Sequence, residues 1–211
     1  MEALFPFLER FGAAETQADR ATIESELFDR FGRSGAVLIS DMAGFSRITK
    51  AKGIVHYMNM IRRMRLAFAS EVTKSGGQVI KFVADNAYAT FDSVEVAART
   101  LDGVQRRLDV ENRQLEPDSH VMLGAGIEYG AYLALAGEDF FGDPVNIASK
   151  LGEDLATGRE LWLSENAYDR LSEAFKATWR HSWHMERHQV SGLRLKTFKT
   201  HIGDSLMPRE I

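Results

Sequence analysis

The sequence lacks cysteine altogether, and it contains no long uninterrupted run of apolar residues. The absence of cysteine excludes both a disulfide scaffold and thiol chemistry. No apolar stretch approaches the roughly 18 residues that a membrane-spanning helix needs. The start of the chain, MEALFPFLERF, has no basic segment and no cleavage site, which is not typical of a signal peptide. We therefore expect a cytoplasmic protein without a membrane span.

An excess of basic residues is also missing. The chain has 26 Lys and Arg against 30 Asp and Glu, a formal net charge of −4, and no long basic run. A nucleic-acid backbone is therefore not an expected partner. What the chain does have is 211 residues of which 45% are apolar, and these suffice for a well-packed domain.

Three segments follow from the patterning: an N-terminal helical extension over residues 1–33, a main domain over 34–204, and a tail over 205–211. The extension carries an apolar stripe at helical spacing, formed by Leu4, Phe5, Leu8 and Phe11. Two interpretations stay open for it. The extension is either a pair of helices packed on the main domain, or a regulatory or dimer-forming element.

The main domain begins with AVLIS, which is typical of a buried strand, and a helix is predicted from about 54 to 74. Two strands should turn around Asp85-Asn86, and a second helix should cover about 97–108. HVMLGAGIEYGAYLALAG predicts two further strands broken near Gly130. This order indicates an α+β fold with a ferredoxin-like βαββαβ core.

The remaining residues predict elements appended to that core. A helix should start at about 144, with Asp143 as its N-cap and Pro144 at its first position. ELWLS predicts a strand and ENAYDRL a helix, and two strands over about 181–189 and 193–200 should follow.

Two carboxylates stand where strands end. Asp41 follows the apolar strand directly, where burial is costly unless the charge has a partner. In KFVADNAYATF, alternation places Lys81 and Asp85 on one face and turns Ile80 and Phe82 into the core. Neighbouring strands would bring Asp41 and Asp85 together, and like charges then call for a cation such as Mg²⁺. Taken singly, Asp41 could cap the next helix and Asp85 could form a turn.

Two weaker signals accompany the carboxylates. The small residues of the loop MAGFS, before a helix, would let backbone N–H groups approach an anion. In DFFGDPVNIASKL, Asn146 and Lys150 lie four residues apart on one helical face and could meet a polyanionic transition state. An ordinary solvated helix face would explain the same pair.

Together, these motifs resemble the catalytic domain of class III nucleotidyl cyclases. Their order and spacing carry the resemblance, which extends over about residues 34 to 200: DMAGFS, KFVAD, and GIEYG followed by DFFGDPVNIASKL. The resemblance implies a homodimeric enzyme with active sites at the subunit interface. It would convert a nucleoside triphosphate into a 3′,5′-cyclic nucleotide and pyrophosphate, using two Mg²⁺ or Mn²⁺ ions in each site.

The resemblance also assigns roles by position. Asp41 and Asp85, with the Met42 carbonyl, match the metal ligands, and the backbone of Gly44, Phe45 and Ser46 matches the triphosphate loop. Lys81 and Asp139 match the pair that reads the base, and their identities point to ATP as the substrate. Asn146 matches the residue that orients the ribose, and Lys196 loosely matches a lysine that contacts the phosphates.

The sequence departs from the family pattern at three positions. Lys150 replaces the arginine that stabilises the transition state, and it keeps the charge without the bidentate fork. Ala84 replaces a glycine, which is harmless only if its φ is negative, and Asn86 follows Asp85. These departures support an alternative function: a degenerate cyclase domain that binds nucleotide or dimerises as a regulatory module.

A zinc site at His181, His184 and His188 is a third interpretation. It is the weakest of the three, because the histidines fall in a predicted strand and no acidic or further histidine partner stands at ligand spacing.

Overall fold

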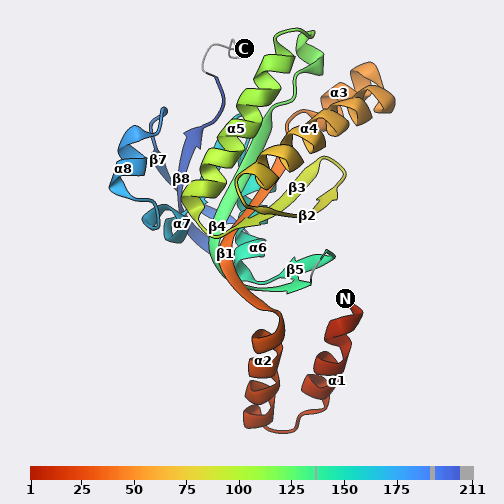
Figure 1. Ribbon diagram of the computed structural model, residues 1–211, viewed down its shortest axis with the longest axis vertical. Helices are drawn as coiled ribbons and strands as arrows, with labels where there is room; N and C mark the ends of the chain where they lie inside the picture. The colour runs from red at the N-terminus through yellow and green to blue at the C-terminus, as the bar shows by residue number, and fades with distance from the viewer. Residues whose placement is uncertain (136, 191–192, 205–211) are drawn as a thin grey trace.

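A single eight-stranded sheet forms the body of the molecule, and a helical hairpin projects from one end of it (Figure 1). The computed structural model describes residues 1–135, 137–190 and 193–204, without the side chains of residues 45, 46, 190 and 193. The strand order is β2-β3-β1-β4-β6-β8-β7, and β5 pairs with β4 off this path. No helix within the described ranges is long and apolar enough to cross a membrane.

The strands are β1 (Gly32–Met42), β2 (Gln78–Val83), β3 (Asn86–Phe91), β4 (Leu123–Leu135), β5 (Asp139–Phe141), β6 (Glu160–Ser164), β7 (His184–Val190) and β8 (Leu193–His201). The α-helices are α1 (Phe5–Ala13), α2 (Gln17–Phe31), α3 (Phe45–Lys52), α4 (Ile54–Lys74), α5 (Val94–Asn112), α6 (Asp143–Ser149), α7 (Glu165–Asp169) and α8 (Glu173–Thr178). Short 3₁₀ turns are η1 (Glu2–Leu4) and η2 (Pro117–Ser119), and η3 (Lys150–Leu155) is π-helical.

The predicted ferredoxin-like core is confirmed. Its four strands lie in the order β2-β3-β1-β4, and α4 and α5 make the two crossovers between them. Strand β1 is central, pairing antiparallel with β3 on one side and with β4 on the other. The appended β6 runs parallel to β4, and β8 and β7 continue the sheet. Because β1 is an inner strand, Asp41 near its C-terminal end has neighbouring strands on both sides.

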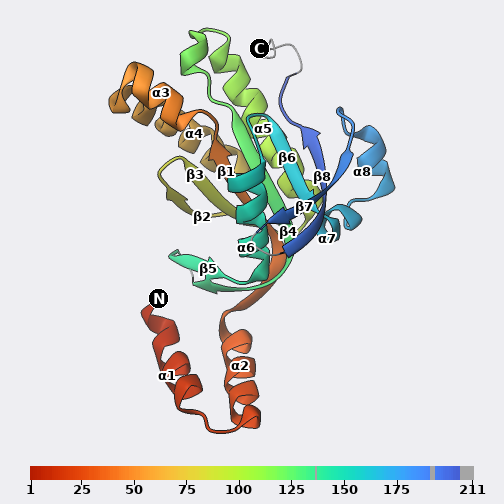
Figure 2. The ribbon, with the colours of Figure 1, turned by 180° about the vertical axis from the view of Figure 1, so that it is seen from behind.

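Side chains of β1 alternate between two hydrophobic cores. Ala36, Leu38 and Met42 belong to the larger core, which packs under α4 and α5. Val37 and Ile39 belong to a smaller core on the opposite face, beneath α6, and Asp41 continues this second row. Figures 1 and 2 show the two faces, with α4 and α5 on one and α6 on the other. Asp41 is therefore directed to the face that carries α6.

The predicted break near Gly130 is wrong, because β4 runs unbroken from Leu123 to Leu135. Glycine is required there for close packing instead: a Cβ atom at Gly130 would lie 2.6 Å from the Pro144 ring. The start of α6 also differs from the prediction. Gly142 is the N-cap, with φ at 148°, and Asp143 is the first helical residue.

The strict alternation predicted for β2 is also wrong at Ile80. Val79 pairs with Ala89 and Lys81 with Tyr88, so a bulge leaves Ile80 without a partner of its own. Phe82 packs against the larger core as predicted, whereas Ile80 packs against the smaller core on the α6 face. The bulge therefore adds an apolar residue to the face that Lys81 occupies.

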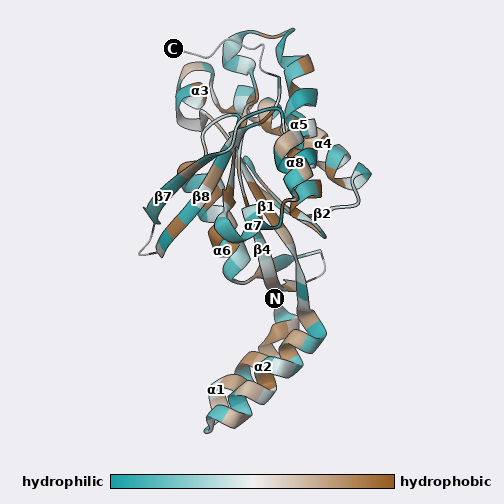
Figure 3. Ribbon diagram, turned by 90° about the vertical axis from the view of Figure 1, so that its left-hand side faces the viewer, coloured by the Kyte–Doolittle hydropathy of each residue, from teal (hydrophilic) through white to brown (hydrophobic). Residues whose placement is uncertain are grey.

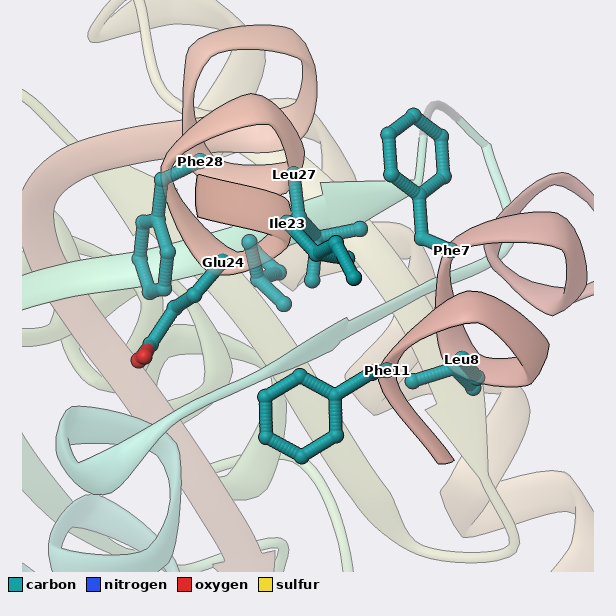
Figure 4. Close-up of a pocket in the computed structure, with 8 residues that line it drawn as sticks. Phe7, Leu8, Phe11, Ile23, Glu24, Leu27 and Phe28 are labelled. Atoms are coloured by element: carbon teal, nitrogen blue, oxygen red, sulfur yellow. The ribbon is translucent and has the colours of Figure 1, made fainter. Parts of the chain in front are cut away.

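The helical hairpin of α1 and α2 meets the domain through a small apolar cluster, and the N-terminal ammonium of Met1 pairs with Glu138 beside it. Leu4, Leu27 and Leu135 are its buried members. A cavity of about 250 Å³ lies between the two helices, and Figure 4 shows Leu8, Phe11 and Phe28 along it. Figure 3 shows the apolar residues of both helices and the projection of the hairpin away from the sheet. The described contacts thus dock the hairpin at its base.

We predict that Leu27→Ala weakens this docking far more than Leu8→Ala does. Leu27 is 9% exposed in the cluster, whereas Leu8 is 49% exposed. Truncating a buried leucine costs about 2–5 kcal/mol, and an exposed one usually less than about 1 kcal/mol. Hydrogen exchange of the α1 and α2 amides measures the free energy of local opening. Equal effects of the two substitutions would show that the cluster does not hold the hairpin.

Candidate active site

Two aspartates meet at the end of β1. Ser40 pairs with Ala87, so Asp41 lies beside the β2–β3 turn that carries Asp85. The two carboxylates are within hydrogen-bonding reach, and the N–H of Met42 donates to Asp41. Burial, followed by the charge of Asp85, raises the pKa of Asp41 to about 7. The charge of Asp85 therefore disfavours the ionisation of Asp41.

Asp85 is held from the α4 side. The hydroxyl of Tyr57, which is completely buried on α4, donates to Oδ2 of Asp85 at 2.8 Å. Arg65 donates to the carbonyl oxygen of Ala84 at 2.6 Å, and this fixes the turn from the same helix. Ala84 itself has a φ of 49°, the left-handed conformation in which a glycine would be free of strain. The turn thus accepts a strained alanine and keeps its carboxylate in place.

A third carboxylate, that of Glu153, lies on the same face. Its Oε1 accepts from Asn86 Nδ2 at 3.0 Å and from the Tyr88 hydroxyl at 2.9 Å, and its Oε2 accepts from the Ser149 hydroxyl at 2.9 Å. The charge of Glu153 contributes to the raised pKa of Asp41. The sequence analysis missed Glu153, because no linear pattern shows that η3 turns it toward β3.

Lys81 and Asp139 form an ion pair at 2.7 Å, and each side chain is 30% exposed. Asp139 also accepts from the N–H of Phe140 at 2.8 Å, and the Lys81 ammonium lies 5.1 Å from the centre of the Tyr88 ring. The hairpin of β4 and β5 brings β5 next to β2, as Figure 2 shows, and Asp139 is the first residue of β5. The two residues predicted to read a base are therefore adjacent and partly accessible.

Asn146 lies on α6, and Lys150 begins η3 one turn later. Asn146 is exposed and makes no side-chain hydrogen bond to any residue that the structure describes. Lys150 is half-buried and has no ion pair within the same ranges. Both polar groups are available to a ligand.

The helical run of α6 and η3 separates Asn146 from the two aspartates. A Cβ atom at Gly124, which pairs with Asp41, would lie 3.0 Å from the Cβ of Ala156. Pro144, at the start of α6, packs on Gly130, which pairs with Gly35, and six residues of β1 separate Gly35 from Asp41, on the order of 20 Å along the strand. A single chain therefore does not bring Asn146 to Asp41 and Asp85.

Lys196 lies outside this arrangement. It is on β8 and pairs with Glu165 of α7 at 2.6 Å. The strand pairings place His201 of β8 level with Asp41 of β1, with β4 and β6 between the two strands. Lys196 lies five residues from His201 along β8. That displacement is roughly 20 Å, so Lys196 cannot contact a ligand at the aspartates of its own chain.

The predicted triphosphate loop is the N-terminal end of α3. Gly44 is its N-cap, with φ at 93°, directly after Met42 and Ala43. The first N–H groups of a helix have no partner inside it and can face an anion. The backbone of Phe45 and Ser46 belongs to this first turn, whereas their side chains lie outside the described part of the structure.

The residues present fit a magnesium or manganese ion better than zinc. Asp41 and Asp85 offer hard oxygen ligands, and Mg²⁺ is commonly held by one or two carboxylates together with substrate phosphates. Among the described residues, no group of three or more His, Asp or Glu side chains is arranged to hold a metal by itself. This applies to the histidines around β7 as well.

The comparisons with known proteins point the same way. No family model matches the sequence. An uncharacterized protein of Mycobacterium tuberculosis is 28% identical over 122 residues, which are 58% of this chain and 30% of that protein. A putative adenylate cyclase of Rhizobium meliloti is 26% identical over 137 residues, 65% of this chain and 23% of that protein. The chain thus spans less than a third of the length of these relatives.

Solved structures match over more of the chain, at lower sequence identity. The adenylate/guanylate cyclase/hydrolase of Silicibacter pomeroyi aligns with a TM-score of 0.65 at 21% identity, over 81% of this chain and 97% of that one. The guanylyl cyclase Cya2 aligns with a TM-score of 0.66 at 17% identity, over 83% of this chain and 95% of that one. The chain has the fold of adenylate and guanylate cyclase catalytic domains. In this cyclase fold, the aspartate pair, the Lys81–Asp139 pair and Asn146 share the sheet face that carries α6.

Without divalent cations, we predict that the folded domain loses stability as the pH rises from about 4 to about 7. The folded pKa of Asp41 is about 7, against 3.8 for an ordinary aspartate, so the folded state holds this proton more tightly. The stabilisation is complete below the unfolded pKa and is lost as the pH passes through the folded pKa. Asp41→Asn cannot ionise and should flatten the dependence.

Thermal unfolding with a chelator at pH 5 and pH 8 measures this effect. Asp41→Asn should melt above the unmutated chain at pH 8, and by a clearly smaller margin at pH 5. Asp92→Asn is the control, because Asp92 is exposed. A pH dependence that survives in Asp41→Asn would contradict the assignment.

Proposed function

We propose that this chain is the catalytic domain of an adenylate cyclase, which converts ATP into 3′,5′-cyclic AMP and pyrophosphate. The observation that carries the proposal is the convergence of Asp41 and Asp85 within the cyclase fold. Two half-buried carboxylates in contact are unfavourable without a cation, and a triphosphate substrate brings such cations with it. The reaction is an in-line attack of the ribose 3′-hydroxyl on the α-phosphorus.

Two ions of Mg²⁺ or Mn²⁺, held by Asp41, Asp85 and the Met42 carbonyl, would lower the pKa of the attacking hydroxyl and neutralise the phosphates. The protein itself positions the substrate. The first turn of α3, from Gly44 to Ser46, offers backbone N–H groups to the triphosphate. Lys150 adds a positive charge where negative charge develops on the phosphates.

Lys81 and Asp139 would select adenine. In adenine, the N6 amino group donates and N1 accepts, which suits the carboxylate and the ammonium respectively. Their present ion pair keeps both side chains at one place and partly exposed. Asn146 would hydrogen-bond the ribose and turn its 3′-hydroxyl toward the α-phosphorus.

We further propose that the site is completed by a second subunit. Asn146 lies near the start of α6, which packs level with Gly35, on the order of 20 Å along β1 from Asp41, too far for one nucleotide to bridge in the geometry required. A head-to-tail homodimer would place Asp41 and Asp85 of one subunit against Asn146 and Lys150 of the other. In such a dimer, Lys196 could reach a triphosphate only in a site formed with the partner's residues.

A second candidate function is a regulatory module that binds nucleotide or dimerises without turnover. Two observations favour it: Lys150 in place of the family's arginine, and the left-handed Ala84 beside Asp85. An arginine that stabilises phosphoryl transfer is worth about 10³–10⁵ in rate, and lysine would recover only part of this.

Turnover of the purified chain distinguishes the two functions. With ATP, GTP, CTP and UTP tested separately in Mg²⁺ and in Mn²⁺, we expect cyclic AMP from ATP alone. Asp85→Ala should abolish the product, and Lys150→Arg should increase kcat because the fork of arginine binds the transition state in two places. Nucleotide binding without any cyclic product, in either metal, would favour the regulatory module.

Complementation tests the shared site. Asp41→Ala and Asn146→Ala chains should each be inactive alone, and their mixture should regain about a quarter of the unmutated activity, because half of the dimers are mixed and each has one intact site. Activity of the mixture no higher than that of either variant would contradict a site shared between subunits.

A further inference from the structure

Glu153 ties two parts of the proposed site together. It comes from the π-helical η3, and its carboxylate accepts hydrogen bonds from Asn86 and Tyr88 on β3 and from Ser149 at the end of α6. Asn86 directly follows Asp85, and Ser149 directly precedes Lys150. The Glu153 side chain therefore links β3, which begins directly after Asp85, to the end of α6, which directly precedes Lys150.

The same contacts keep Glu153 away from Lys150. A carboxylate three residues after a lysine on a helix is normally in reach for an ion pair. Here both oxygens of Glu153 are taken by neutral donors, and Lys150 has no ion pair within the described ranges. The ammonium group is therefore left for an anion from outside the chain.

The π-helical geometry is part of this arrangement. Helical turns of this type are rare, and they frequently occur at functional sites. η3 begins at Lys150, and at its C-terminal end Ala156 already packs on Gly124 of β4. Gly152 fits against β1 so closely that a Cβ atom there would lie 2.4 Å from the carbonyl oxygen of Ile39. Glu153 follows this contact, so its backbone is fixed on the sheet.

We propose that Glu153 is a positioning residue: its hydrogen bonds to β3 and α6 fix the helical segment that presents Lys150, and they leave the Lys150 ammonium unpaired for the triphosphate. This inference rests on the proposed function, since it assigns Lys150 to the phosphates. Glu153 does not touch the substrate, and it acts through the orientation of Lys150.

Two substitutions separate the hydrogen bonds from the charge. Glu153→Gln keeps an oxygen that accepts from Asn86 and Tyr88, and its amide can donate to the Ser149 hydroxyl. Glu153→Ala removes all three bonds. Asp154→Ala is the matched control, because it deletes the neighbouring exposed carboxylate of the same segment.

We expect Glu153→Ala to lower kcat about 10-fold with little change in the KM for ATP, since an interaction made in the transition state is lost. Glu153→Gln and Asp154→Ala should stay within about 3-fold of the unmutated chain. The concentration of metal at half-maximal activity should not change. A shift in that metal concentration, at unchanged kcat, would make Glu153 a metal ligand and overturn the proposal.

Hydrogen exchange provides a readout that does not depend on turnover. Amides of residues 150–155 should exchange faster in Glu153→Ala than in Glu153→Gln, while those of α5 stay unchanged. Equal exchange rates in all variants would show that Glu153 does not fix this segment. That result would overturn the proposal even if the enzyme is active. If the unmutated chain makes no cyclic nucleotide, the proposed function fails, and faster exchange confined to residues 150–155 would still support the positioning role.

Discussion

The repulsion between Asp41 and Asp85 is the constraint on which the rest of the site depends. Burial and the neighbouring carboxylate together raise the pKa of Asp41 to about 7, so the metal-free site accepts both charges only at a cost. The fold nevertheless holds them together. The hydroxyl of Tyr57 donates to Asp85, and Arg65 donates to the carbonyl oxygen just before it, at Ala84. The N–H of Met42 donates to Asp41. Groups kept together at such a cost are typical of a functional site.

The sheet explains why this arrangement is stable. Asp41 extends the row of Val37 and Ile39, which are fully buried in the smaller core, so its position follows from the strand that anchors it. The β2 bulge adds Ile80 to that core and sets Lys81 opposite Tyr88. Gly126 and Gly130 of β4 and Gly152 of η3 let the helical run and the sheet approach each other closely. Packing of small residues thus positions the polar ones.

Much of this was predictable from the sequence. The helix from Ile54 to Lys74 and the order of the core strands follow from apolar periodicity, which reports burial directly. The prediction failed where close packing uses residues that usually mark a break. Gly130 was interpreted as the end of a strand, although it accommodates Pro144. A bulge such as the one at Ile80 leaves no trace in the alternation of residues.

The candidate site was predictable only where a motif exists. Asp41 and Asp85 stand at strand ends, and that pattern is visible in the sequence. Glu153 is separated from Asn86 by 66 intervening residues, and its contact depends on the π-helical turn. Tyr57 was predictable as a core residue from its helical spacing, but its hydroxyl bond to Asp85 depends on how α4 crosses the sheet. Long-range polar contacts of this kind need the three-dimensional structure.

The most direct test of the account is the release of protons when Mn²⁺ binds together with a non-cyclisable ATP analogue. Calorimetry in two buffers of different ionisation enthalpy measures this release. A carboxyl group with a pKa of about 7 is largely protonated at pH 6 and must lose its proton to bind a metal. We predict clear proton release at pH 6 that falls by pH 8 and is absent in Asp41→Asn. Binding with the same proton balance in both chains, or no metal binding at all, would contradict the central role of the aspartate pair.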